Sequence, residues 1–146
     1  IELFAYRQSG PFFVQNFEAE EKMNLFLFDG TMVSTPSNFV SLMLLSTSIR
    51  LRLGLPTVNV ITKTDLIEEK LQQVLSWSGT DSKLEADLAG EVNGDTFSLV
   101  SDMLTSINRN DFQQDLIPVS NATGDGMVNL QSALSRTINL GEEIED

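Results

Sequence analysis

The sequence predicts an α/β fold in which a parallel sheet is flanked by helices. Three short apolar runs alternate along the chain with longer helical segments, which is the order typical of parallel sheets with helical crossovers. Turn residues bound each run, as expected for buried strands. With 146 residues, of which 41% are hydrophobic, the chain is the size of one domain and can build a core.

The first elements are a short helix, a second short helix and a strand. Residues 1–8 resemble the end of a helix, and Gly10-Pro11 is expected to break it before Pro11 opens the next one. The apolar run 23–28 predicts a buried strand that ends at Asp29-Gly30. Asp29 is expected to be a turn residue, although it faces the edge where parallel sheets bind ligands.

A long helix follows, with clear signals at both ends. Thr35 is a typical N-cap, Pro36 suits the first helical position, and Gly54 is expected to end the helix after Leu53. The apolar surface of this helix is wider than one stripe. One side is expected to pack on the sheet and the other to meet a neighbouring helix or a second subunit.

The remaining elements complete the alternation. They are a strand at 58–61, an amphipathic helix at 68–78, an acidic region at 80–111 that is expected to be helical, a strand at 116–119, and a helix at 126–140 that Gly141 ends. Trp77 is expected to pack the helix at 68–78, with a partner-binding anchor as the alternative.

Composition excludes several classes of function. The chain has no cysteine and no histidine, which removes thiol chemistry, zinc-thiolate sites and the commonest general base. Residues 1–60 carry five acidic and four basic side chains, whereas residues 61–146 carry sixteen and five, for a net charge of −12. Such a chain is a poor nucleic-acid binder. Without an apolar run of membrane-spanning length, we expect no membrane association and a cytoplasmic location.

Polar loops follow the second and third predicted strands. The first is Thr62-Lys63-Thr64-Asp65, and the second begins with Ser120-Asn121-Ala122. A fixed carboxylate at Asp65 can accept the two adjacent N–H donors of guanine, and the Lys63 stem can cover the flat base. A backbone N–H of the second loop can donate to guanine O6. Each loop also has a simpler reading, since Asp65 can cap the next helix and residues 120–126 can form an ordinary turn.

Taken in order, these two loops resemble the Asn/Thr-Lys-x-Asp and Ser-Ala-Lys guanine motifs of P-loop GTPases. More closely, the chain resembles the GPN-loop GTPases in their archaeal form, because of the segments that open it, form its central helix and close it. Those segments are Ile1-Glu2-Leu3-Phe4, Thr35 to Ser41, Leu51 to Pro56, Asn59 to Leu66 and Gly141 to Glu145. Asn121 and Ala122 depart from the family's usual Ala and Lys.

The resemblance implies a P-loop NTPase-like sheet, incomplete at its N-terminal side, in which residues 1–146 are the C-terminal part of one GTPase domain with a helical insertion at about 68–111. It implies binding of GTP and GDP, GTP hydrolysis by the complete protein, a homodimer, and a partner related to RNA polymerase assembly. The guanine-binding residues would be Thr62, Lys63, Asp65, Ser120, Asn121 and Ala122.

The phosphate-binding signature Gly-x-x-x-x-Gly-Lys-Ser/Thr does not occur in the sequence. We therefore assign no catalytic residue and no metal ligand to this chain, expect Mg²⁺ only in the complete domain, and expect these residues alone to be inactive. The competing hypothesis is a non-catalytic acidic α/β module for interaction or dimerisation, which predicts no effect of guanine nucleotides.

Overall fold

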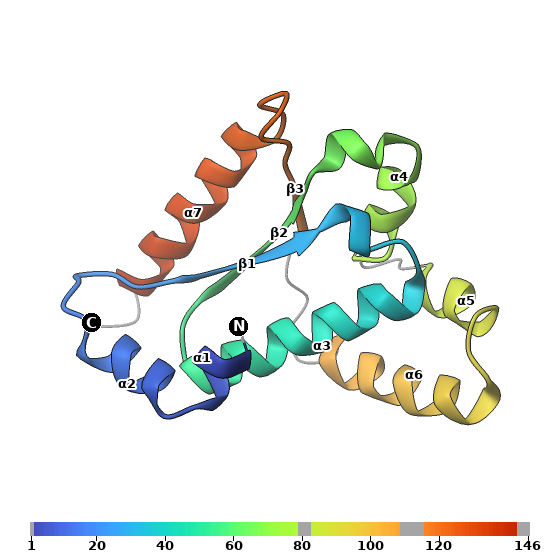
Figure 1. Cartoon of the computed structure of the whole chain (residues 1–146), viewed down its shortest axis with the longest axis horizontal. Coiled ribbons are helices and arrows are strands. Elements are labelled where there is room, and N and C mark those ends of the chain that lie inside the picture. The colour runs from blue at the N-terminus through green and yellow to red at the C-terminus, as the bar shows by residue number, and fades with distance from the viewer. Residues whose placement is uncertain (1, 79–82, 109–115, 143–146) are drawn as a thin grey trace.

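The computed structural model describes residues 2–78, 83–108 and 116–142. Its centre is a three-stranded parallel sheet in the order β1-β2-β3, formed by β1 (Asn24–Asp29), β2 (Thr57–Thr62) and β3 (Leu116–Pro118) (Figure 1). Asn24 pairs with Thr57 at one end of β1, and Asp29 pairs with Thr62 at the other. The predicted α/β class and the parallel sheet are confirmed.

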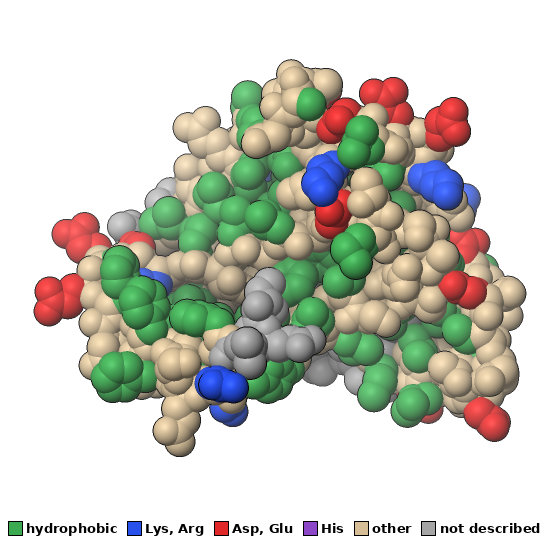
Figure 2. Space-filling view, in the orientation of Figure 1, with side chains coloured by type: hydrophobic (Ala, Val, Ile, Leu, Met, Phe, Trp, Pro, Cys, Tyr) green, Lys and Arg blue, Asp and Glu red, His purple; other side chains and the backbone are tan. Residues whose placement is uncertain are grey.

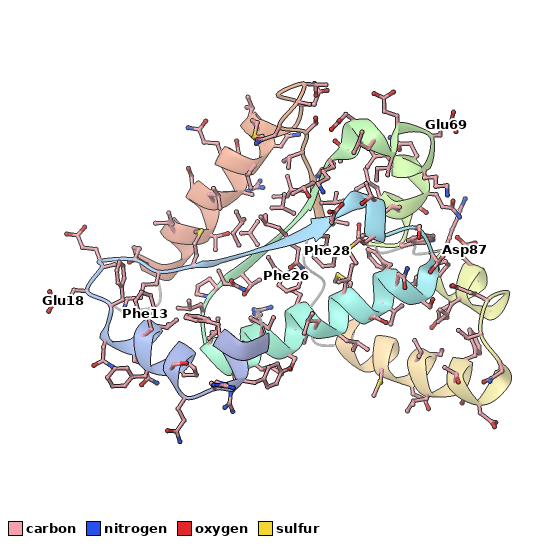
Figure 3. All side chains as sticks on the ribbon, viewed as in Figure 1. Phe13, Glu18, Phe26, Phe28, Glu69 and Asp87 are labelled. Atoms are coloured by element: carbon pink, nitrogen blue, oxygen red, sulfur yellow. The ribbon has the colours of Figure 1, made fainter. Side chains whose placement is uncertain are left out.

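The burial of the strands follows from their position in the sheet. β2 is central, and its residues from Thr57 to Ile61 are all buried, as in a strand covered on both faces. β1 alternates instead: Phe26 and Phe28 are buried, whereas Leu27 is 54% exposed. Phe26 and Phe28 lie on the side of β1 that faces α3 and stack edge to face on each other (Figure 3).

The long helix α3 (Pro36–Leu53) has the predicted ends. The hydroxyl of Thr35 accepts a hydrogen bond from the N–H of Asn38, and Gly54 ends the helix in the left-handed conformation. One side of α3 packs on β1, and other parts contact α1 (Glu2–Tyr6), α2 (Ser9–Asn16) and α5 (Leu84–Ala89). Neighbouring helices of the same chain thus cover part of its wide apolar surface, whereas Leu51 is 70% exposed.

The first two helices differ from the prediction at Gly10. This residue does not break a helix, because it lies inside α2. A Cβ at this position would lie 1.9 Å from the carbonyl oxygen of Phe4, so glycine allows α1 and α2 to approach closely. Arg52 of α3 holds the end of α1 by donating to the carbonyl oxygens of Ala5 and Tyr6, both at 3.1 Å.

The described residues between β2 and β3 form three helices: α4 (Glu68–Ser76), α5 and α6 (Gly94–Asn108). Trp77 directly follows α4, is 3% exposed and packs against Phe39 of α3 with ring centroids 5.6 Å apart. Its indole N–H donates to Asp87 of α5 at 2.8 Å. Trp77 therefore packs the helices together, and the alternative of an exposed partner anchor is wrong.

On the second face of the sheet, α7 (Met127–Glu142) packs over β2 and β3 and leaves the β1 side chain Leu27 exposed (Figure 1). Ala133 of α7 forms a small core with Val58 and Val60 of β2 and with Ile117 and Val119 of the β3 segment. The helix continues past Gly141, so the prediction that Gly141 ends it is wrong. The parts of the predicted 80–111 region at 80–82 and 109–111 lie outside the described residues, as do residues 143–146.

Acidic and apolar side chains occupy different parts of the surface. In the view of Figure 2, acidic groups lie mainly at the periphery, whereas apolar groups gather around α2 and between β1 and α7. The exposed apolar side chains of the α1–α2 segment include Phe12 at 66% and Phe13 at 54%. Among the described residues, no helix has the length and apolar character that crossing a membrane requires.

Candidate functional site: the loops at the carboxyl edge of the sheet

The candidate site lies where the three parallel strands end. The loop after β1 begins at Asp29, the loop after β2 contains the 3₁₀ helix η2 (Thr64–Leu66), and the loop after β3 runs from Val119 to Gly126 (Figure 1). Carboxyl ends of parallel strands meet at one edge, which is where α/β sheets bind ligands. The fold therefore brings both predicted base loops to the same edge.

The two base loops are joined by a side-chain hydrogen bond. The hydroxyl of Ser120 donates to Oδ1 of Asp65 at 2.6 Å, although the two residues are 55 positions apart in sequence. Ser120 is fully buried, and its oxygen also accepts from the backbone N–H of Thr123 at 3.2 Å. The N–H of Thr123 thus directs the hydroxyl proton of Ser120 toward Asp65, which fixes the half-buried carboxylate at the edge of the sheet.

The simpler reading of Asp65 as a helix cap is wrong. Helix α4 begins after Ile67, and no side chain caps its first turn. Asp65 lies in η2, where the backbone N–H of the preceding Thr64 donates to the carbonyl of Val119 at 3.3 Å. The backbone and the carboxylate of this segment are therefore both tied to the β3 loop rather than to α4.

The loop after β3 is held by its own hydrogen bonds. The N–H of Ser120 donates to the carbonyl of Asp125 at 3.0 Å, and the N–H of Gly124 donates back to the carbonyl of Ser120 at 2.9 Å. The hydroxyl of Thr123 donates to the Asp125 carboxylate at 2.6 Å. Asn121 and Ala122 are exposed residues next to Ser120, and across the described residues no hydrogen bond uses their N–H groups. These N–H groups are available as donors to a ligand.

Lys63 is held at the same edge from a neighbouring strand. Its ammonium group forms an ion pair with Oδ2 of Asp29 at 2.6 Å. Thr31 donates both its N–H and its hydroxyl to Oδ1 of the same carboxylate, at 3.0 and 2.7 Å. The hydrogen bond from Lys63, followed by that from Thr31, lowers the pKa of Asp29 to about 2. Asp29 is thus a turn residue, as predicted, and also a charged partner of Lys63 at the predicted site.

Thr62 contributes to the junction between the strands. Its hydroxyl donates to the carbonyl oxygen of Phe28 at 3.1 Å, which ties the end of β2 to the end of β1. A Cβ at Gly30 would lie 2.6 Å from the carbonyl oxygen of Thr62, so these loops are in direct contact. Thr62 is therefore placed to support Lys63 and Asp65 through the backbone rather than to touch a ligand with its hydroxyl.

A pocket of about 480 Å³ lies beside these loops. It is lined by Gly30, Thr31, Val33, Ser34 and residues 65–70. Asp65 thus lies at the boundary between the pocket and the β3 loop. Over the ranges 2–78, 83–108 and 116–142, no group of three or more acidic side chains is gathered as a metal site.

Two long-range contacts behind the site had no signal in the sequence. The carboxylate of Glu91 accepts from both the N–H and the hydroxyl of Ser37, at 2.9 and 2.8 Å, and so caps the first turn of α3. These bonds lower the pKa of Glu91. The pKa of Asp87 is lowered as well, first by the indole N–H of Trp77 and then by Gln73. Only the tertiary structure brings these carboxylates to their partners.

Comparison with known proteins identifies the family of the chain. A family model described as "Conserved hypothetical ATP binding protein" matches residues 1–140. GPN-loop GTPase 1 of Saccharomyces cerevisiae is 26% identical over 148 aligned residues, covering 94% of this chain. The chain belongs to the GPN-loop GTPase family. A GPN-loop GTPase 2 homolog of Dictyostelium discoideum is 46% identical over 43 residues, which are 30% of this chain and 14% of the homolog.

The fold of the family member is also found in a solved structure. A GTPase from Pyrococcus abyssi in its apo form matches 93% of this chain with a TM-score of 0.74 at 19% identity. The alignment covers 54% of that chain, and the yeast relative is covered over 38% of its length. This chain therefore spans about half, or less, of the proteins that it resembles.

Proposed function

We propose that this chain forms the guanine-binding part of a nucleotide site. We also propose that the full-length protein to which it belongs hydrolyses GTP to GDP and phosphate. The observation that carries the proposal is the hydrogen bond from Ser120 to Asp65 at 2.6 Å. It joins the two loops that resemble the guanine motifs and fixes an acceptor beside free backbone donors. Membership of the GPN-loop GTPase family supports the same activity.

The arrangement matches the edge of guanine. Each carboxylate oxygen of Asp65 has two lone pairs, so the carboxylate can accept the N1–H and the 2-amino group of guanine while Oδ1 still accepts from Ser120. The exposed N–H groups of Asn121 and Ala122 are suitable donors to O6. Adenine presents an acceptor at N1 and a donor at its 6-amino group, so this site would reject it. We therefore propose GTP and GDP as ligands, although the family description names ATP.

The remaining predicted site residues have separate roles in the proposal. Lys63 supplies an apolar stem for the face of the base. The hydroxyl groups of Thr62 and Ser120 connect the loops, through hydrogen bonds to Phe28 and Asp65. Mg²⁺ would accompany GTP in the full-length protein. Because the described residues bring no three acidic groups together, we assign Mg²⁺ and the chemical step to no residue of this chain.

The test is a change of base specificity in the full-length protein. Asp65→Asn replaces one acceptor by a donor, so guanine loses its paired interaction. Two charge-assisted hydrogen bonds contribute about 1.5–3 kcal/mol each, and their loss predicts GDP binding weaker by at least about a hundredfold. Xanthine carries a carbonyl in place of the 2-amino group, so the same variant should bind xanthosine diphosphate better than the wild type does.

Isothermal titration with GDP, ADP and xanthosine diphosphate makes this measurement, and Asp125→Asn serves as a control in the neighbouring loop after β3. The Asp125 carboxylate bonds to Thr123 rather than to Asp65 or Ser120, so its loss should not exchange guanine for xanthine. Unchanged GDP affinity in Asp65→Asn would show that Asp65 does not read the base.

We also propose a cytoplasmic homodimer with a partner related to RNA polymerase assembly, as the family resemblance implies.

A second function, a non-catalytic interaction module, is favoured by the exposed aromatic side chains Phe4, Phe12, Phe13 and Phe17 of the α1–α2 segment. The interaction module predicts no thermal stabilisation by GDP. Light scattering of the full-length protein with Phe12→Ser tests whether this segment joins two copies.

A further inference from the structure

In the ion pair between Asp29 and Lys63, the two carboxylate oxygens of Asp29 have different partners. One carboxylate oxygen of Asp29 is fixed by two hydrogen bonds from Thr31, and the other receives the Lys63 ammonium at 2.6 Å. The carboxylate is therefore oriented independently of the lysine. Since Lys63 follows β2 and Asp29 ends β1, the lysine stem crosses from one strand end to the next.

The backbone of Lys63 is a second and independent observation. Its φ of 58° and ψ of 37° place it in the left-handed region, where glycine and asparagine are more easily accommodated than lysine. Among the described residues, Lys63 is the non-glycine residue with a positive φ. This conformation follows directly after the central strand and precedes Asp65 by two residues. An unfavourable backbone conformation at such a place indicates that the side chain itself is needed there.

Stability of the loops does not require this ion pair. The Thr62 hydroxyl already ties β2 to the carbonyl of Phe28, and Gly30 packs against the carbonyl of Thr62. The Lys63 and Asp29 side chains are 53% and 31% exposed, and ion pairs this exposed contribute little to folding. The pair therefore fixes the position of a side chain more than it holds the two loops together.

We infer that Asp29 is a positioning residue of the base site. It holds the Lys63 ammonium at the end of β1, so that the lysine methylenes are ordered to pack against the face of the guanine ring. This inference rests on the proposed guanine site. A lysine stem that is already ordered loses less conformational freedom when the base binds, so Asp29 raises nucleotide affinity without touching the nucleotide.

The experiment uses the full-length protein and measures both GDP affinity and melting temperature. Asp29→Asn keeps the shape of the side chain and its acceptor for Thr31, but it presents an amide to Lys63. We expect GDP affinity to fall by about tenfold, because ordering one flexible side chain on binding lowers affinity by about that factor. Because the ion pair is exposed, the melting temperature should hardly change.

A double-mutant cycle separates positioning from general damage. Lys63→Met keeps an unbranched apolar stem without the ammonium group, so adding Asp29→Asn to it should weaken GDP binding no further. The charge exchange of Asp29→Lys with Lys63→Asp restores an ion pair between the loops but moves the stem to β1. GDP affinity should stay low, and because Asp29→Lys also removes the acceptor for Thr31, the melting temperature of the exchange is compared with that of Asp29→Lys alone.

Three outcomes would overturn the inference: unchanged GDP affinity in Asp29→Asn, additive losses in the cycle, or full recovery of GDP affinity by the charge exchange. Asp65→Asn distinguishes this failure from that of the proposed function. If Asp65→Asn weakens GDP binding and Asp29→Asn does not, the positioning role alone is wrong. If neither variant weakens it, the guanine site itself is wrong.

Discussion

Gly126, which lies just before α7, offers a sharp test of how the base loop is built. Its φ is +77°, and a Cβ at this position would lie 1.9 Å from the carbonyl oxygen of Pro118 and 2.9 Å from the carbonyl carbon. Pro118 is paired with Ile61 in the sheet, so it cannot shift without disturbing β2. Gly126→Ala should therefore displace the β3 loop rather than be absorbed.

The expected size follows from two separate terms. A positive φ costs an alanine about 1–2 kcal/mol, and a forced contact in a packed region costs about 1–3 kcal/mol, which together predict a loss of about 2–5 kcal/mol for Gly126→Ala. Gly124 is a matched control in the same loop. Its φ is +83°, but a Cβ there would meet nothing within 4 Å, so Gly124→Ala should lose only the first term.

Urea unfolding of the full-length protein, followed by circular dichroism, measures the free energy of unfolding of both variants. GDP titration adds a functional measure, since the displaced loop carries Ser120 and the free N–H groups beside it. Gly126→Ala should weaken GDP binding more than Gly124→Ala does. Equal losses of stability in the two variants would refute the reasoning, because the contact with Pro118 would then have no measurable effect.

Three further predictions concern the helices behind the site, each measured as a free energy of unfolding. Trp77→Phe keeps an aromatic ring but leaves Asp87 without the indole donor, so it should destabilise the protein by about 1–3 kcal/mol. Ser46→Ala removes a buried 2.7 Å hydrogen bond to Asn59 of β2 and should cost a similar amount. Glu91 has a lowered pKa, so its capping bonds stabilise the fold above its ordinary titration range and are lost as the pH falls through its folded value. The wild type should therefore be more stable than Glu91→Gln at neutral pH, and this difference should shrink in acid.

Local signals were sufficient for the elements whose ends are chemically marked. Thr35 and Gly54 predicted both ends of α3, because an N-cap hydroxyl and a left-handed glycine act within one turn of the helix. The strands were also predictable, since apolar runs of that length between turn residues have few other uses in a parallel sheet. Topology predicts that the loops of Asp65 and Ser120 share one edge, because both follow neighbouring parallel strands, but it does not predict the hydrogen bond between the two side chains.

Predictions failed where a tertiary contact decides the local structure. Glycine usually interrupts a helix, but Gly10 lies within α2. The carbonyl oxygen of Phe4 is so close that no residue with a Cβ fits at this position. Glu91 is similar: nothing near it in sequence indicates that its carboxylate caps α3. Asp29 is the turn residue that the sequence predicts, since its carboxylate caps the 3₁₀ turn at Gly30–Met32, but nothing near it in sequence indicates its ion pair with Lys63. Such contacts depend on the packing of distant elements, which residue patterns do not encode.

The charge of the chain is compatible with binding an anionic nucleotide if the base is read separately from the phosphates. Lys63 is neutralised by Asp29, so the predicted base site contributes little positive charge to a chain of net charge −12. Guanine itself is neutral, and the groups that would read it are a carboxylate and backbone N–H donors. Their interaction depends on donor and acceptor pattern rather than on attraction between net charges. Specificity can therefore reside in an acidic surface, while the affinity for phosphates must come from groups other than those of the two base loops.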